Sequence, residues 1–254
     1  NTWQKKSSEC VGYRNTSNAN NFQELISQER LKMKKSDLLS MNQNWGLAFR
    51  LDRTTINLIT KIKSNRNQLC RYFPDISQGL IAYDKYQGQT EDIISQRAYH
   101  HKAYKDGLKK WLWGGDVSRY NVLWNNEEYI DYCDEIANPR HPKFFIGRRI
   151  LVREITNPSI YAAFTDEEFY NDPSVIIILD NGKYSLFAAL GILNSKLATF
   201  FHFNHAPKAT KGAFPKILVK DIKEFPLPNI ADGDKIKIET LVQSILSLKK
   251  ENIN

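Results

Sequence analysis

The strongest constraint on the fold is a continuous apolar run, Val175–Leu179, together with the three residues after it. The run reads Val-Ile-Ile-Ile-Leu and contains no polar residue. An uninterrupted β-branched run of this length predicts a strand that is buried on both of its faces. Asp180, Asn181 and Gly182 follow, and these residue types predict a tight turn. We therefore expect a sheet that is covered by other elements.

The residues after this turn predict a helix. Ser185 is a suitable N-cap, and apolar residues then recur at spacings of three and four, which predicts one helix with one buried stripe. The stripe consists of Leu186, Leu190, Leu193, Leu197, Phe200 and Phe201. A buried strand followed by an amphipathic helix predicts the α/β (mixed α+β) class, here a twisted β-sheet with packed helices.

Connector helices are expected on both sides of this domain. Residues 21–35 and 52–63 have helical patterns, and Asp52 is placed to cap the second helix. A last amphipathic helix is expected over about 234–249. Its apolar side would contain Ile238, Leu241, Val242, Ile245 and Leu248.

These elements predict three regions. Residues 1–65 are expected to form a polar linker and a helical connector, and residues 231–254 a C-terminal amphipathic helix. The main domain is expected over 66–230, with short strands near residues 80–83 and 143–155.

Positive charge is segregated along the chain. The formal net charge is +8, yet residues 181–220 contain no carboxylate, and neither do residues 139–153. The second stretch contains Arg140, Lys143, Arg148, Arg149 and Arg153. Cations gathered in this way favour a polyanionic partner such as nucleic acid. The alternative is that apolar elements simply lack acids and that the lysines are ordinary surface residues.

Length and composition limit the class of protein. With 254 residues, of which 41% are hydrophobic, the chain can bury a substantial core. It has no apolar run long enough to span a membrane. Its three cysteines, Cys10, Cys70 and Cys133, are not spaced as metal ligands, and we expect a reducing cytoplasm. The polar start at Asn1 predicts a fragment of a longer polypeptide.

Several segments, in their order along the chain, carry a family resemblance. They are residues 75–79 (DISQG), 113–120 (WGGDVSRY), 147–153 (GRRILVR), 191–196 (GILNSK) and 225–228 (FPLP). With these segments the chain resembles, over about residues 69–229, the TaqI-like C-terminal specificity domain. That domain follows the catalytic domain of adenine-specific DNA methyltransferases and fused restriction-modification enzymes, and it is related to the recognition domains of type I specificity subunits.

The resemblance implies a target-recognition domain that binds double-stranded DNA. It also implies a methyltransferase or nuclease domain in the same polypeptide, with S-adenosylmethionine and magnesium in that catalytic part. The Asn-Pro-Pro-aromatic motif of such methyltransferases is not in this chain, where Asn157-Pro158-Ser159-Ile160 is the nearest string. We therefore expect a reader of DNA, with no catalytic, cofactor or metal residues of its own.

The candidate DNA-binding residues fall into four places. Lysine and arginine suit phosphate contacts, whereas glutamine can read adenine in the major groove. A loop after the long helix offers His205, Lys208, Thr210 and Lys211. A second loop offers Lys85, Tyr86, Gln87 and Gln89. In the strand-like run after residue 147, alternation places Arg149 and Arg153 on one face and Arg148 on the other. Arg119 is the fourth candidate, beside the tryptophans Trp111, Trp113 and Trp124, which fit base stacking or ordinary core packing.

Two other functions stay open at this point. Asp75, Asp116 and Asp221 could meet at a metal ion in a stand-alone nuclease or hydrolase. A protein-docking scaffold is the second alternative, with the helical ends binding a partner subunit. His100-His101 does not predict a metal site, because adjacent side chains point apart.

The double substitution K208A/K211A is expected to weaken binding of duplex DNA similarly on all sequences, because phosphate contacts carry no base information. Each lost phosphate contact lowers the slope of log K against log salt by about 0.9, so the slope should fall by about 1 to 2. Binding titrations at several salt concentrations measure this slope. Equal slopes for the variant and the parent would show that Lys208 and Lys211 do not contact DNA phosphates.

Overall fold

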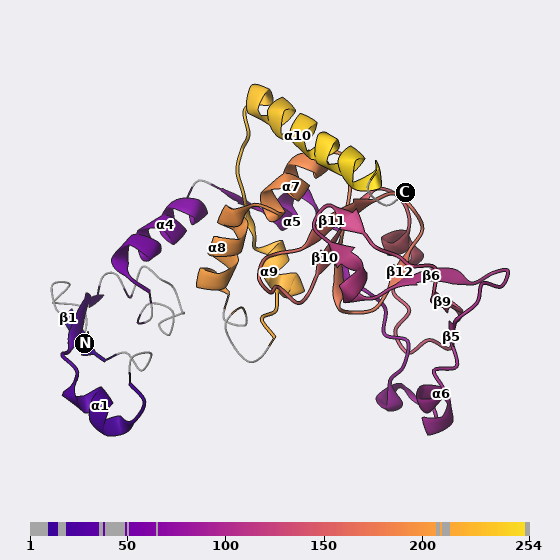
Figure 1. The fold of residues 1–254 in the computed structure, drawn as a ribbon, viewed down its shortest axis with the longest axis horizontal. Coiled ribbons are helices and arrows are strands. Elements are labelled where there is room, and N and C mark those ends of the chain that lie inside the picture. Colours follow the sequence, from indigo (N-terminus) through magenta and orange to yellow (C-terminus); the bar gives the residue numbers. More distant parts are fainter. Residues whose placement is uncertain are drawn as a thin grey trace. The chain divides into compact units, whose positions relative to one another are not determined.

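The computed structural model divides the chain into two compact units, Asn1–Ser64 and Asn65–Asn254, and the elements of both appear in Figure 1. The described residues are 10–14, 19–35, 38, 49, 51–64, 66–206, 209 and 214–251.

The first unit contains a small sheet and two described helices. Strand β1 (Cys10–Tyr13) pairs antiparallel with β2 (Leu31–Lys34), and α1 (Phe22–Ser27) lies between them in the sequence. Helix α4 (Arg53–Lys63) begins after Asp52, whose carboxylate accepts a hydrogen bond of 2.8 Å from a backbone N–H of the first turn. The helix predicted over 52–63 is therefore confirmed.

Two expectations for this unit are corrected. Residues 10–13 were expected in a polar linker but form β1. The helix predicted over 21–35 is wrong in its second part, where β2 lies. The reason is local: Leu31-Lys32-Met33-Lys34 alternates apolar and charged residues with the period of a strand.

The second unit is built on a four-stranded antiparallel sheet in the order β11-β10-β13-β4. Its strands are β11 (Ala162–Thr165), β10 (Arg149–Arg153), β13 (Val175–Leu179) and β4 (Ile76–Gln78). Strand β13 pairs on both sides, and its first four residues are buried. This confirms the buried strand that the apolar run predicts.

The strand predicted over 80–83 is not formed as expected. Strand β4 contains only Ile76–Gln78 and ends before Gly79. In the predicted range, Ile81 forms an isolated bridge to Asn138. Leu80 instead donates its backbone N–H to the carbonyl of Asn171 (3.0 Å).

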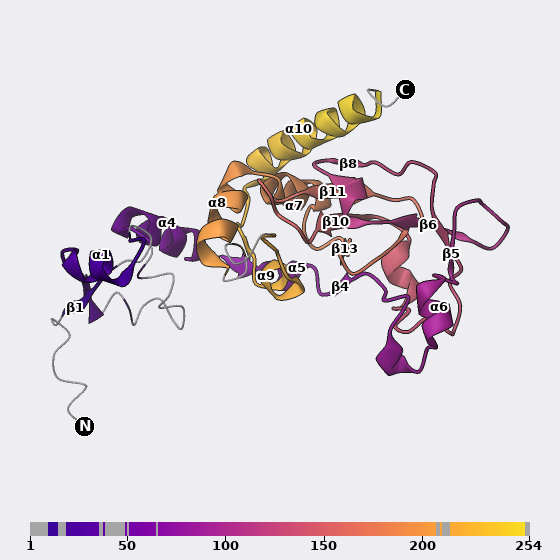
Figure 2. The same ribbon diagram turned by 60° about the horizontal axis from the view of Figure 1, so that its bottom comes forward.

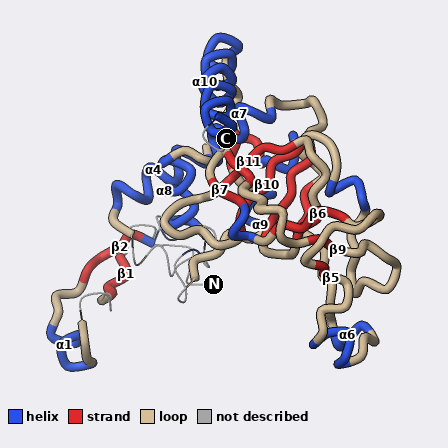
Figure 3. The backbone as a smooth tube through the Cα atoms, turned by 45° about the vertical axis from the view of Figure 1, so that its right-hand side comes forward, coloured by secondary structure: helices blue, strands red, loops and turns tan. Residues whose placement is uncertain are grey.

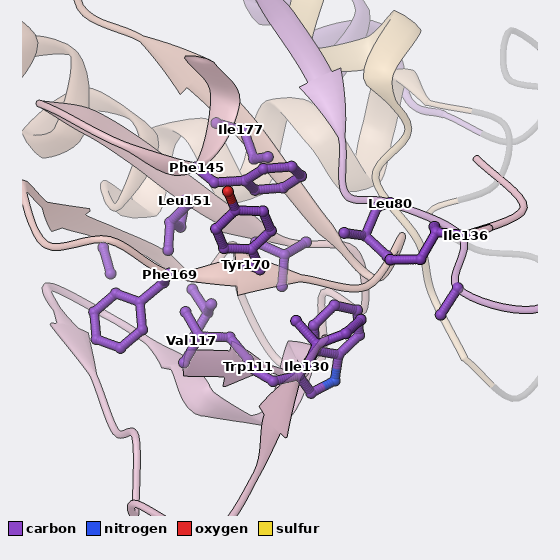
Figure 4. Packing of buried hydrophobic residues seen from close by; sticks show 14 residues of the cluster. Leu80, Trp111, Val117, Ile130, Ile136, Phe145, Leu151, Phe169, Tyr170 and Ile177 are labelled. Carbon is purple, nitrogen blue, oxygen red and sulfur yellow. The ribbon is translucent and has the colours of Figure 1, made fainter. Parts of the chain in front are cut away.

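A second four-stranded sheet has the order β12-β6-β9-β5. Its strands are β12 (Tyr170–Asn171), β6 (Lys109–Leu112), β9 (Tyr129–Ile130) and β5 (His100–His101). Side chains from both sheets meet in one hydrophobic core, where the rings of Phe145 and Tyr170 stack at 4.3 Å (Figure 4). Trp111 is buried in this core and Trp124 packs against it, so both have a packing role, whereas Trp113 is 38% exposed.

The second unit also contains short strands, helices and turns outside these two sheets. Strand β3 (Asn67–Gln68) pairs with β14 (Pro226–Leu227), and β7 (Val117–Ser118) pairs with β8 (Asn121–Val122). The short helices are α5 (Leu69–Tyr72), α6 (Glu91–Ser95) and α9 (Val219–Lys223), and the 3-10 turns are η2 (Lys85–Gln87), η3 (Gly114–Asp116) and η4 (Pro142–Phe145). Figure 3 shows the strands of the second unit in red with α10 and α7 beside them.

The predicted long helix is two helices, α7 (Leu186–Leu193) and α8 (Lys196–His205), with a bend of 64° between them. The bend breaks the predicted stripe, and Leu197 is 59% exposed. Ser185 and Ser195 cap the two helices with their side chains. No single described helix is long and apolar enough to cross a membrane; the bent pair passes by length and composition only, and most of α7 is buried in the unit.

Helix α10 (Asp232–Glu251) packs on α7 (Figure 2). A Cβ on Gly191 of α7 would lie 3.0 Å from Val242 and 3.1 Å from Ile238, so this glycine permits the close approach of the two helices. The predicted helix is confirmed in place, but its apolar residues do not share one covered side, because Leu241 and Leu248 are 64% and 58% exposed. The mixed class of helices packed on sheets is confirmed.

Gly79 is expected to tolerate no side chain. A Cβ at this position would lie 2.1 Å from the carbonyl oxygen of Asp172 and 2.2 Å from that of Asn171. We predict that G79A lowers the free energy of unfolding by about 1–3 kcal/mol, the usual cost of overpacking. The matched control G115A should change it by less than about 0.5 kcal/mol, since that site is open. Urea denaturation of both variants measures the difference, and equal stabilities would contradict the close approach.

Candidate nucleic-acid interface

The basic stretch at residues 139–153 is largely neutralised within the fold. Lys143 Nζ lies 2.8 Å from Asp75 Oδ1, and Arg148 Nε lies 3.1 Å from Asp180 Oδ2. Cations that are paired with carboxylates contribute little to the field beyond a few ångströms. Lys143 and Arg148 remain 47% and 55% exposed, so the two ion pairs reduce the positive field of this stretch, and its contact with a polyanion stays a prediction.

Arg149 is buried, with 0% of its surface exposed. Its guanidinium donates hydrogen bonds to the carbonyls of Gly147 (2.7 Å), Glu167 (2.8 Å) and Phe169 (3.3 Å). Burial lowers the pKa of Arg149 to about 10, so the side chain stays charged at neutral pH. Arg149 therefore ties the segment before β12 to β10, and the predicted pair of arginines facing DNA is corrected.

Arg153 and Arg119 both have partners inside the protein. Arg153 is half-buried, and its guanidinium lies 5.2 Å from the centre of the Tyr161 ring. Arg119 is exposed but donates a hydrogen bond of 2.6 Å to the backbone carbonyl of Asn194. A role of either side chain in DNA binding stays a prediction, and it would compete with these contacts.

Asn194 explains part of the motif at residues 191–196. Its side chain is buried, accepts a hydrogen bond from the backbone N–H of Ala162 (3.2 Å) and donates to the carbonyls of Ala162 (2.9 Å) and Leu190 (3.2 Å). This carboxamide joins the end of α7 to β11. The motif therefore has a structural role at this point of the fold.

The loop after α8 is described in part. His205 lies at the end of α8 with its ring 4.8 Å from that of Phe201 and nearly parallel to it. Lys208, Thr210 and Lys211 lie outside the described residues. Their contact with DNA stays a prediction.

The turn formed by η2 presents three candidate side chains to solvent. Asp84 caps it by accepting a hydrogen bond of 2.8 Å from the backbone N–H of Tyr86, and Gly88 closes it with a φ of 84°, a value that favours glycine. Lys85, Tyr86 and Gln87 are exposed, and Tyr86 is 84% exposed. We name residues 84–88 the first turn. Its geometry offers a cation, an aromatic ring and a carboxamide together.

Gln89 points the other way. Its side chain accepts a hydrogen bond from the backbone N–H of Asp84 (2.9 Å) and donates to the carbonyls of Ala82 (3.0 Å) and Glu135 (2.9 Å). With both ends of the carboxamide bonded to backbone, Gln89 has no free edge for a base. The expectation that Gln87 and Gln89 both read adenine is corrected: the structure leaves Gln87 in a position to do so.

A polar network that the sequence did not predict supports the end of the unit where α6 and β5 lie (Figures 1 and 2). Buried Glu128 accepts hydrogen bonds of 2.6 Å from both Arg97 and the Trp113 indole N–H. His100 lies nearly parallel to Trp113, and burial lowers the pKa of His100 to about 4. No spacing in the sequence connects these residues, since they come from separate segments.

The carboxylates of the nuclease alternative do not come together. Asp75 pairs with Lys143, whereas Asp116 and Asp221 each accept a hydrogen bond from a backbone N–H three residues earlier. Within the described part of the chain, no group of three or more His, Cys, Asp or Glu side chains is arranged to hold a metal ion.

Comparison with known proteins identifies the segment that carries this architecture. Residues 109–227 match the family model of the TaqI-like C-terminal specificity domain. This part of the chain is therefore similar to the TaqI-like C-terminal specificity domain.

Individual relatives are distant. A protein of Methanocaldococcus jannaschii, described as a type II restriction enzyme and methyltransferase, is 23% identical over 175 residues, which are 67% of this chain and 14% of that protein. The type IIG restriction endonuclease BpuSI has a similar fold (TM-score 0.53, 14% identity), over 89% of this chain and 32% of the BpuSI chain. The type IIL restriction-modification enzyme MmeI, solved in complex with DNA, is matched at a TM-score of 0.47 and 10% identity, over 70% of this chain and 28% of that chain. The chain thus spans a minor part of the length of these proteins.

Substitution of Arg149 is expected to affect stability. We predict that R149M lowers the free energy of unfolding by about 1–3 kcal/mol or more, because buried carbonyls lose their donor. The control R148A removes an exposed arginine of an ion pair and should cost less than about 1 kcal/mol. Urea denaturation distinguishes the two. An R149M variant as stable as the parent would show that these hydrogen bonds do not support the fold.

Proposed function

We propose that this chain recognises a specific sequence in double-stranded DNA and positions it for a catalytic domain of the same polypeptide. The observation that carries the proposal is that residues 109–227 match the family model of the TaqI-like specificity domain. The net charge of +8 fits a polyanionic partner. The named activities of the relatives support a methyltransferase or nuclease as that catalytic part.

The chemistry of the whole protein is part of the proposal. Adenine would be methylated at N6 with S-adenosylmethionine as the methyl donor, and cleavage by the same protein would use magnesium. Both groups would bind in the catalytic part. The role of the present chain is to read the site.

Base reading is assigned to the first turn. Gln87 has an exposed carboxamide, which can bond the N6 and N7 edge of adenine in the major groove, whereas Lys85 suits a phosphate. Tyr86 offers a ring at the apex of the turn. The bonded Gln89 holds the backbone at the base of the turn that carries the three outer side chains.

The proposal predicts that selection from randomised duplexes, with this chain joined to its natural catalytic part, recovers one sequence motif. Q87A should relax the preference for adenine at one position of that motif, since a bidentate contact is worth about 1–3 kcal/mol of discrimination. Q243A removes an exposed glutamine of α10 and is the matched control, expected to select the parent motif.

The outcomes separate two failures. If the parent selects no motif, the chain is not a sequence-specific reader. If the parent selects a motif and Q87A selects the same one, the reader role stands and Gln87 does not read adenine.

A further inference from the structure

We infer that the connection between β5 and β6 is a second contact for the phosphate backbone of duplex DNA. We name residues 102–108 the second turn, and its contact residues are Lys102, Tyr104 and Lys105. This inference rests on the proposed function. The second turn lies before residues 109–227, so the family match does not include it.

The second turn has a defined shape. Strand β9 lies between β5 and β6, so the second turn must pass an end of β9 to join them. The backbone N–H of Leu108 donates to the carbonyl of Lys105 (3.1 Å), and Gly107 has a φ of 91°. The ring of Tyr104 lies 5.5 Å from that of Tyr129 on β9, yet Tyr104 remains 61% exposed. The turn is thus anchored while its polar groups face solvent.

The charges of this turn are not neutralised by ion pairs. Lys102 and Lys105 are exposed, and among the described residues neither has a carboxylate within 4.0 Å. The next lysines along the chain differ: Lys109 pairs with Glu168 and Lys110 with Glu167, each at 3.0 Å. Asp106 is also exposed on this turn and reduces its net charge by one.

This pattern fits the DNA backbone. Two lysines on either side of an exposed tyrosine hydroxyl give three donors to phosphate oxygens, which bind duplex DNA without reading its sequence. The second turn contains no glutamine, asparagine or arginine that could form a bidentate contact with a base edge. We therefore assign base reading to the first turn and contact with the DNA phosphates to the second turn.

One polar contact connects the starts of both turns. Tyr83 immediately precedes the first turn, and His100 comes two residues before the second. The Tyr83 hydroxyl accepts a hydrogen bond from the backbone N–H of Tyr99 (2.9 Å) and lies 2.8 Å from His100 Nδ1. Burial lowers the pKa of His100 to about 4, so the ring is neutral at neutral pH and its Nδ1 can accept a hydrogen bond from the Tyr83 hydroxyl. Tyr83 is therefore a positioning residue that fixes the two turns relative to each other before DNA arrives.

The test uses K102A/K105A in the full chain, with K249A/K250A as a control that removes the same charge from exposed positions on α10. Binding to a duplex carrying the selected motif is titrated at several salt concentrations. We expect the slope of log K against log salt to fall by about 1 to 2 for K102A/K105A, at about 0.9 per phosphate contact, and to be unchanged for the control. Thermal unfolding checks that both variants keep the parent's stability.

Y83F is measured in the same titrations, since it keeps the ring and removes the hydroxyl. It should weaken binding by roughly twofold to tenfold, the range of one hydrogen bond, with the salt slope of the parent. Equal affinities of Y83F and the parent for duplex DNA would show that the Tyr83 hydroxyl does not position the two turns.

The remaining outcomes are distinct. If the parent binds duplex DNA and K102A/K105A keeps its slope, or if both double variants lose the same slope, the second turn is not a contact and the proposed function stands. If the parent binds no duplex at low salt, the proposed function fails. Preference for RNA or an acidic peptide over duplex DNA would overturn the inference.

Discussion

The hydrogen bonds of the Asn194 carboxamide are the constraint on which the architecture of the second unit depends. Asn194 bonds both the N–H and the carbonyl of Ala162 on β11, and its own carbonyl accepts a hydrogen bond from Arg119. A buried amide left without partners costs about 1–3 kcal/mol per group, so these three segments hold one mutual geometry. Asn194 lies at the break between α7 and α8, where Ser195 has an extended backbone and caps α8.

In the segments that resemble the family, several residues serve the packing of the fold. Gly79 and Gly114 stand where a Cβ would collide with backbone or with Ser174, Arg149 satisfies buried carbonyls, and Asn194 joins a helix to a strand. Such residues specify how the sheets and helices meet. These residues do not determine which bases are read, because we expect base recognition from side chains on turns, which the packing of the core does not constrain.

Local patterns predicted the local structure of this chain, and contacts distant in sequence account for what they missed. The run at Val175–Leu179 is apolar throughout, which is enough to predict the buried strand β13. Alternation places Arg149 and Arg148 on opposite faces of the strand, but it cannot tell that both faces of β10 are covered, since Arg149 to Val152 are all buried. Gln87 and Gln89 look alike in the sequence, and their difference depends on Glu135, 46 residues beyond Gln89. The hydrogen bonds of Asn194 likewise reach Ala162, 32 residues earlier in the sequence.

The net charge of this protein therefore does not tell how many cationic side chains are exposed and without a carboxylate partner. In the sequence stretch richest in arginine, Lys143 and Arg148 pair with carboxylates and Arg149 is buried against carbonyls, so much of its charge is engaged within the fold. Lys85, Lys102 and Lys105 have no carboxylate partner among the described residues and lie on turns whose bases are fixed by hydrogen bonds. A polyanion responds to unpaired cations on rigid supports, because their charge is not screened locally and little ordering is needed on binding. We therefore expect these turns, more than the arginine-rich strand, to attract the DNA backbone.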